Sequence, residues 1–188
     1  MLGRYREDAN LCLSSAGSNG FDNANCDRVF DPAVNGNVRP GVAQKVNLTL
    51  WNVQPDSDTA AVDLKVFAPT ACVGGTTGSP AGSADLCDGL RLRIDRYNSV
   101  TERNLGTNGT CLVGCTGSGV TLTSFRTTHP DFASGVSIAT NFPVNAKAYL
   151  VITALLPDTG FTSQGRGNDN RYLARTATLP LRWQMVSA

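Results

Sequence analysis

The feature that most constrains the fold is a repeated alternation of apolar and polar residues with a period of two. It runs through residues 46–50, 62–66 and 90–95, where valine, leucine and isoleucine occupy one face and mostly polar or charged residues the other. No stretch repeats apolar residues at the i, i+3, i+4, i+7 spacing of an amphipathic helix over a dozen positions. Each alternating segment is typical of a β-strand with one buried face.

Three further segments add to this pattern. Residues 149–156 are apolar on both faces, which predicts a central strand that is covered on both sides. Apolar residues also alternate over 179–185, where Pro180 predicts an edge or a bulge because proline cannot donate to a ladder. Between the strands we expect no helix beyond a short helical or 3₁₀ turn near residues 130–134.

Turns rich in asparagine, glycine and aspartate separate the predicted strands, as at residues 35–37, 54–58 and 108–109. Many short strands without long helices predict an all-β fold, an antiparallel β-sandwich or jelly roll. The length of 188 residues fits one domain. We divide the chain into an N-terminal segment, residues 1–29, and a jelly-roll domain, residues 30–188.

The N-terminal segment carries an alternation of its own. Apolar side chains recur at every second position from Tyr5, with Glu7 as the exception, and the residues of this face are Tyr5, Ala9, Leu11 and Leu13. This pattern predicts a half-buried strand. It is either the first strand of its own domain or a strand donated to the sheet of a neighbouring subunit, a known mode of assembly.

Six cysteines fall in three sequential pairs: Cys12 and Cys26, Cys72 and Cys87, Cys111 and Cys115. We expect three disulfides that close short loops, although the sequence alone does not fix the pairing. The alternative is a metal site, but only 111–115 approaches a zinc-ligand spacing and no partner ligands lie nearby. Disulfides predict an exported, extracellular protein whose signal peptide has been removed.

Charge excludes some partners. Sixteen lysines and arginines against fifteen acidic residues leave a net charge of +1, whereas nucleic-acid binding favours a strong basic excess. No segment is basic enough for an anionic membrane surface or long enough in apolar residues to span a bilayer. We therefore expect neither nucleic acid nor a membrane as partner.

Catalytic residues are scarce. His129 is the only histidine, it lies in a predicted loop, and no serine sits in a Gly-x-Ser-x-Gly elbow. A second histidine for a His-Glu-x-x-His zinc site does not exist, and no phosphate-binding glycine loop is present. We expect a protein that is not an enzyme and that uses no cofactor or catalytic metal.

Two kinds of weaker site remain. Aspartates in turns could hold Ca²⁺ through loop oxygens, although aspartate is common in turns for backbone reasons alone; these residues are Asp22, Asp27, Asp56, Asp58, Asp85, Asp88 and Asp169. Asn47 and Asn108 each begin an Asn-x-Thr sequon and are possible glycosylation sites. We expect the dispersed aromatic residues to pack in the core rather than to form a ligand platform, namely Trp51, Tyr97, Phe125, Tyr149 and Trp183.

Several segments together resemble the TasA/camelysin family of exported bacterial matrix proteins. Residues 38–42 and 46–52 resemble the family's Pro-Gly turn followed by a strand that ends near asparagine, and 86–92 resembles a mid-domain strand. Residues 145–152 are similar to the late central strand, and 170–183 to the closing strand. The resemblance covers about residues 30–188. It implies a jelly-roll subunit that polymerises into extracellular fibres by donating its N-terminal strand.

The sequence also departs from this family. The region before Phe30 does not match the usual mature start and carries Cys12 and Cys26, and Pro180 is unusual in the closing strand. Some members have been described as metallopeptidases, but this chain has no pair of zinc ligands, so that activity is not carried over.

The sequence thus predicts a secreted structural subunit that assembles head-to-tail into filaments by donor-strand complementation. Its partners would be copies of itself and other matrix proteins. One alternative is an extracellular carbohydrate- or surface-binding module, which would show a row of exposed aromatic side chains. Another is a virion or tail structural protein, for which jelly rolls are common.

Overall fold

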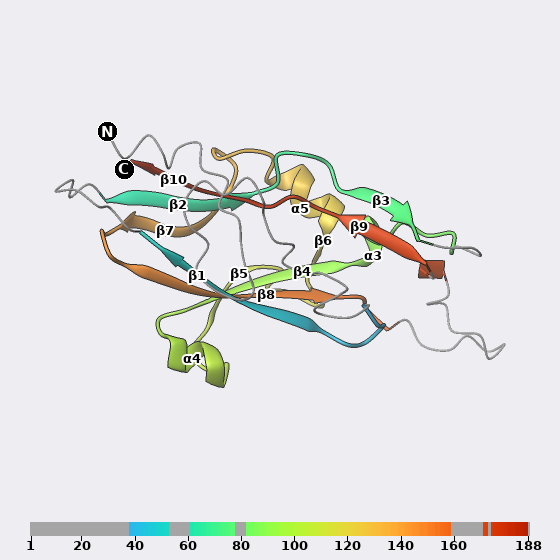
Figure 1. Ribbon diagram of the computed structural model, residues 1–188, viewed down its shortest axis with the longest axis horizontal. Coiled ribbons are helices and arrows are strands. Elements are labelled where there is room, and N and C mark those ends of the chain that lie inside the picture. The colour runs from blue at the N-terminus through green and yellow to red at the C-terminus, as the bar shows by residue number, and fades with distance from the viewer. Residues whose placement is uncertain (1–37, 53–60, 78–81, 159–170, 173, 188) are drawn as a thin grey trace.

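The computed structural model describes residues 38–52, 61–77, 82–158, 171–172 and 174–187 (Figure 1). Two antiparallel sheets pack face to face, so the all-β sandwich predicted from the alternation is confirmed. The N-terminal segment, 1–29, lies outside the described residues.

The larger sheet has the strand order β1–β8–β4–β5. Its strands are β1 (Gln44–Trp51), β8 (Lys147–Leu155), β4 (Arg91–Tyr97) and β5 (Thr110–Val113), and β6 (Val120–Thr121) also pairs with β4. The apolar segment 149–156 therefore supplies β8, which lies between two neighbours as predicted.

The second sheet has the order β10–β2–β7, made of β10 (Arg182–Ser187), β2 (Val62–Phe67) and β7 (Val136–Phe142). A separate pair, β3 (Val73–Thr76) and β9 (Arg175–Thr178), extends beyond it at one end (Figure 1).

Side chains from both sheets form one core. The inner faces of β1, β8 and β4 meet those of β2, β7 and β10, and the largest fully buried side chains include Trp183, Phe125, Leu64, Ile94 and Ile152. Burial of this apolar surface supplies the main driving force for folding. Arg96 of β4 also crosses between the layers, because its guanidinium donates to the Ile138 carbonyl of β7.

Three short helices lie between the described strands, which corrects the expectation of no helix beyond a turn near residues 130–134. They are α3 (Leu86–Gly89), α4 (Val100–Leu105) and α5 (Leu122–Thr128). Ser99 and Thr121 cap the latter two by accepting from the backbone N–H groups of Glu102 and Ser124. These helices are too short to show a helical period of apolar residues in the sequence. The capping residues Ser99 and Thr121 were the sequence features from which α4 and α5 could have been predicted. Residues 130–134 form turns rather than a helix.

The end of the chain also differs from its prediction. Instead of one bulged strand over 179–185, β9 ends at Thr178, β10 begins at Arg182, and the two strands belong to different sheets. Pro180 lies in the connection, where its missing N–H is not needed for a ladder.

Two disulfides are present, Cys72–Cys87 and Cys111–Cys115, with Cα–Cα distances of 5.9 and 5.5 Å. The sequential pairing predicted for these four cysteines is confirmed, whereas Cys12 and Cys26 lie outside the described residues. The two bonds favour a compartment outside the reducing cytoplasm.

Candidate functional site

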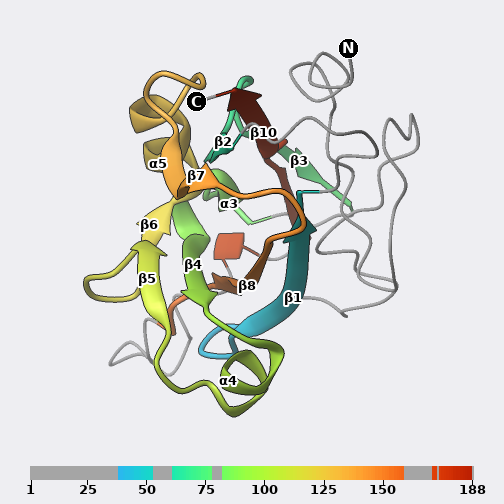
Figure 2. The ribbon, with the colours of Figure 1, turned by 90° about the vertical axis from the view of Figure 1, so that its left-hand side faces the viewer.

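The first candidate is the edge of the larger sheet formed by β1. Within the described residues, Lys45–Trp51 pair only with β8, so β1 has one neighbour. Figure 2 shows β1 and β10 on one side of the sandwich, whereas β6 and α5 lie on the other. An edge strand presents backbone donors and acceptors that another chain can pair with.

The residues predicted to fill such an edge are Tyr5, Ala9, Leu11 and Leu13. They lie outside the described residues, as do Cys12 and Cys26. Their assignment as a donor strand stays a prediction.

The second candidate is the outer face of the larger sheet, meaning the side of β1, β8 and β4 turned away from the second sheet. Strand register aligns its residues in four rows across the sheet: Lys45–Thr153–Arg93, Asn47–Val151–Asp95, Thr49–Tyr149–Tyr97 and Trp51–Lys147. The rows combine cations, aromatic rings and uncharged polar groups, although Val151 and Asp95 in the second row are buried.

Trp51 corrects the expectation that the aromatic residues lie in the core. Its side chain is 47% exposed at the end of β1, whereas Trp183 and Phe125 are buried as expected. The Lys147 ammonium lies 4.5 Å from the centroid of the Trp51 ring, within range of a cation–π contact. Extending the alternation of β1 by one step places Trp51 on the polar face beside Thr49, so the sequence held a signal for this exposure that the apolar character of tryptophan obscured.

Arg103 of α4 anchors that helix over the outer face. Its guanidinium lies 5.7 Å from the centroid of the Tyr149 ring, and Nη1 donates to the Leu48 carbonyl and the Thr49 hydroxyl at 3.1 and 3.0 Å. Tyr149 and Tyr97 are half-buried beneath this arrangement. Only Trp51 among these rings is strongly exposed.

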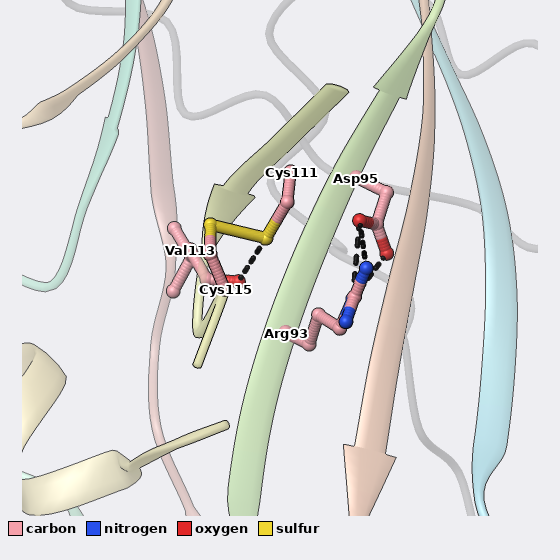
Figure 3. Close-up of polar contacts among 5 residues, drawn as sticks. All are labelled: Arg93, Asp95, Cys111, Val113 and Cys115. Atoms are coloured by element: carbon pink, nitrogen blue, oxygen red, sulfur yellow. Dashed lines mark hydrogen bonds and ion pairs between the residues drawn. A yellow bond between two sulfur atoms is a disulfide. The ribbon is translucent and has the colours of Figure 1, made fainter. Parts of the chain in front are cut away.

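Arg93 and Asp95 form an ion pair on the same face of β4 (Figure 3). Arg93 donates through Nε and Nη2 to both carboxylate oxygens at 2.8–3.1 Å, which is a two-pronged arrangement. The hydrogen bonds that Arg93 donates to Asp95 raise the pKa of Arg93 above its ordinary value. Asp95, expected to face solvent, has a side chain that is only 10% exposed, because the guanidinium and neighbouring strands cover it.

The Cys111–Cys115 disulfide lies across β4 from this ion pair (Figure 3). It ties Cys111, the second residue of β5, to the turn that follows the strand, and Cys115 is exposed. Gly114 in this turn has φ of +66°, and a Cβ there would lie 2.4 Å from the Leu92 carbonyl oxygen. The glycine is therefore required for the tight passage of the chain beside β4.

His129 lies near Asp131 and Ser134, the residue types of a hydrolytic triad, but they are connected as a turn. His129 Nδ1 is 2.6 Å from the backbone oxygen of Ser134, not from its hydroxyl. The Ser134 backbone N–H and hydroxyl both donate to Asp131, and these bonds lower the pKa of the carboxyl. The contacts account for turn geometry and do not activate the serine.

A hollow of about 170 Å³ lies between α5, β5 and β6. Its lining is mainly apolar, with Phe125 and Val113 at the core side and His129 at the rim. This volume is well below the roughly 300–1,000 Å³ of a typical small-molecule site. The hollow is therefore not the basis of a function.

No group of three or more His, Cys, Asp or Glu side chains is close enough to hold a metal ion in the part of the chain that the structure describes. Asp85 caps α3 by accepting from the Cys87 N–H at 2.9 Å, and Asp88 is exposed in that helix. The other turn aspartates lie outside the described residues: Asp22, Asp27, Asp56, Asp58 and Asp169.

Both sequon asparagines are exposed. Asn47 projects from the outer face of β1, and Asn108 lies in a turn with φ of +58°, a left-handed conformation that asparagine tolerates. Their glycosylation stays a prediction.

The sequence analysis did not single out Asn52, a fully buried polar residue that follows β1. Its amide nitrogen donates to the carbonyls of Phe142 and Pro143, each at 3.0 Å. Asn52 thereby fixes the turn between β7 and β8. In the sequence, the only indication of this role is that Asn52 is a polar residue directly after a predicted strand.

Among the described residues, no helix is long and apolar enough to cross a membrane. Comparison with known proteins adds no identity: no family model matches the chain, and no curated protein matches its sequence.

Proposed function

We propose that the protein is a secreted structural subunit that assembles head-to-tail into extracellular filaments. The observation that carries the proposal is the edge of β1, a long alternating strand with one neighbour within the described residues. Addition of a strand to such an edge supplies a ladder of backbone hydrogen bonds, with side-chain pockets for specificity.

The N-terminal segment is the proposed donor. Its alternation supplies an apolar face made of Tyr5, Ala9, Leu11 and Leu13, which suits a sandwich whose inner layer is apolar. Exchange of the segment between successive copies is a heterologous contact, which produces an open filament when the rotation does not close into a ring. The resemblance to the TasA/camelysin family agrees with this mode.

Two further features support the proposal. Net charge of +1 leaves little repulsion between copies, and the two disulfides suit an extracellular protein. Other matrix proteins are possible additional partners. No catalytic arrangement is needed for this role.

The test is negative-stain electron microscopy of the purified, non-reduced protein over a range of concentrations. We expect long uniform filaments from the wild type and folded monomers from the double variant Leu11→Asp/Leu13→Asp. The matched control is Arg6→Asp/Asn10→Asp, which places the same groups on the opposite face of the segment and should still polymerise. Normal filaments from the first variant would contradict strand donation, and compact particles from the wild type would contradict the filament itself.

A further inference from the structure

The outer face of the larger sheet carries exposed charged, aromatic and polar side chains. Strand addition at the edge of β1 does not require these side chains. From Lys45 to Trp51 this face extends for six residue steps along β1, which is about 20 Å at 3.4 Å per residue. It is a surface rather than a cavity, and therefore suits an extended chain better than a small molecule.

Cations gather on this face. Lys45, Lys147 and Arg93 project from the sheet, and Arg103 lies over it from α4. The carboxylates in the same area are already engaged: Asp95 is bound by Arg93, and Glu102 accepts from the Asn98 N–H. Within the described residues, the four cations Lys45, Lys147, Arg93 and Arg103 and the two carboxylates Asp95 and Glu102 leave a charge of +2 on this face.

An aromatic ring and uncharged polar groups accompany these charges. Trp51 is 47% exposed, and its ring stands beside the Lys147 ammonium. Asn47, Thr49 and Thr153 project between the two ends of the face and can donate and accept hydrogen bonds. A tryptophan ring stacks against the C–H groups of a sugar ring, lysines pair with carboxylates, and amide and hydroxyl groups match sugar hydroxyls.

We propose that the outer face binds an acidic polysaccharide, with Trp51 stacking on a sugar ring and Lys147 and Lys45 pairing with uronic-acid carboxylates. The small number of cations, together with an exposed aromatic ring and uncharged polar groups, favours this polymer over nucleic acid, which rewards a strong basic excess. An acidic peptide would more readily add to a sheet edge. The proposal does not depend on filament assembly.

The test is fluorescence anisotropy of labelled polygalacturonate with the full-length, non-reduced protein, compared with labelled neutral dextran. We expect saturable binding of polygalacturonate alone, weakened by added salt because charges on a surface are screened. Trp51→Ala should weaken binding about tenfold through loss of the aromatic contact. Lys147→Gln should weaken it about threefold, as expected for one exposed ion pair.

The matched control is Arg182→Gln, which removes an exposed cation from β10 in the opposite sheet and should leave binding unchanged. Circular dichroism of each variant confirms that it is folded. Equal binding of dextran would overturn the acidic class of ligand, and wild-type affinity in Trp51→Ala and Lys147→Gln would overturn the assignment of the face. Displacement of the probe by oligo-dT at lower concentrations than by unlabelled polygalacturonate would identify a nucleic-acid surface instead, and no binding would overturn the proposal.

Discussion

The two faces of the larger sheet are formed by the same three strands, but they differ in the burial and in the polarity of their side chains. On the inner face Leu48 lies in register with Leu150, and Ile94 lies in register with Ile152. All four side chains are almost completely buried. One residue further along each strand, Thr49, Tyr149 and Asp95 belong to the outer face, where exposure ranges from strong to slight. The comparison separates residues that hold the sandwich together from residues available for recognition.

The physical reason lies in the period of a strand. Successive side chains point to opposite faces, so each strand contributes to both layers at once. The inner layer gains free energy by removing apolar surface from water, a non-directional effect that tolerates many apolar sequences. The outer layer buries less apolar surface, because several of its side chains, including Asn47, Thr49 and Trp51, remain exposed to water.

The largest expected effect is on the inner face. Ile152→Ala should lower the free energy of unfolding by about 4 kcal/mol, because it removes buried methyl groups and leaves a cavity. The comparison change on the outer face is Thr153→Ala in the same strand, where the side chain is half-buried and we expect no more than about 1 kcal/mol. Urea unfolding followed by tryptophan fluorescence measures both. Equal losses would mean that the two faces contribute equally and would remove the basis of the comparison.

A smaller effect is expected from the ion pair on the outer face. Arg93→Gln should cost about 1 kcal/mol, since the arginine is partly exposed and solvent screens much of the pair. A raised pKa in the folded state means that the stabilising charge of Arg93 is present below its unfolded pKa and is lost only above its folded pKa. Both values lie far above neutrality, so the loss should be the same at pH 6 and pH 9. Urea unfolding at both pH values tests this, and a loss that disappears at pH 9 would be inconsistent with a permanently charged guanidinium.

The smallest expected effect belongs to Trp51. Trp51→Ala should change the free energy of unfolding by no more than about 0.5 kcal/mol, because the exposed ring covers little core surface. Thermal unfolding monitored by circular dichroism measures the change, with Trp183→Ala as the destabilised counterpart from the core. A loss near that of Trp183→Ala would make Trp51 a structural residue and would weaken its role in recognition.

Much of the fold was predictable because strand alternation is a local property. The strands around Val46, Val62, Leu92 and Leu150 formed where apolar and polar residues alternate or where apolar residues run continuously. The helices α4 and α5 were missed because six or seven residues are too few to show a helical period, and their formation depends on the caps Ser99 and Thr121.

The candidate site was less predictable. Asp95 has the sequence context of a surface residue, and only the fold places Arg93 over it while strands on both sides restrict its access to water. Trp51 has the composition of a core residue, yet its position at the end of an edge strand leaves the ring exposed. Neither outcome follows from residue type. The burial of Asp95 depends in part on strands that are distant in sequence, whereas the outward position of Trp51 follows from its place in the alternation of β1.

The sequence by itself determined the class of the fold, since a period of two in apolar residues can bury one face only by pairing strands into a sheet. It also predicted three disulfides between cysteines that are close along the chain, and the two that lie among the described residues are confirmed. Tertiary structure alone decided which strands became edges, that Pro180 separates two sheets, and that Lys45, Lys147 and Trp51 share one surface. The reason is that register between strands brings together residues about a hundred positions apart, and no local pattern encodes that pairing.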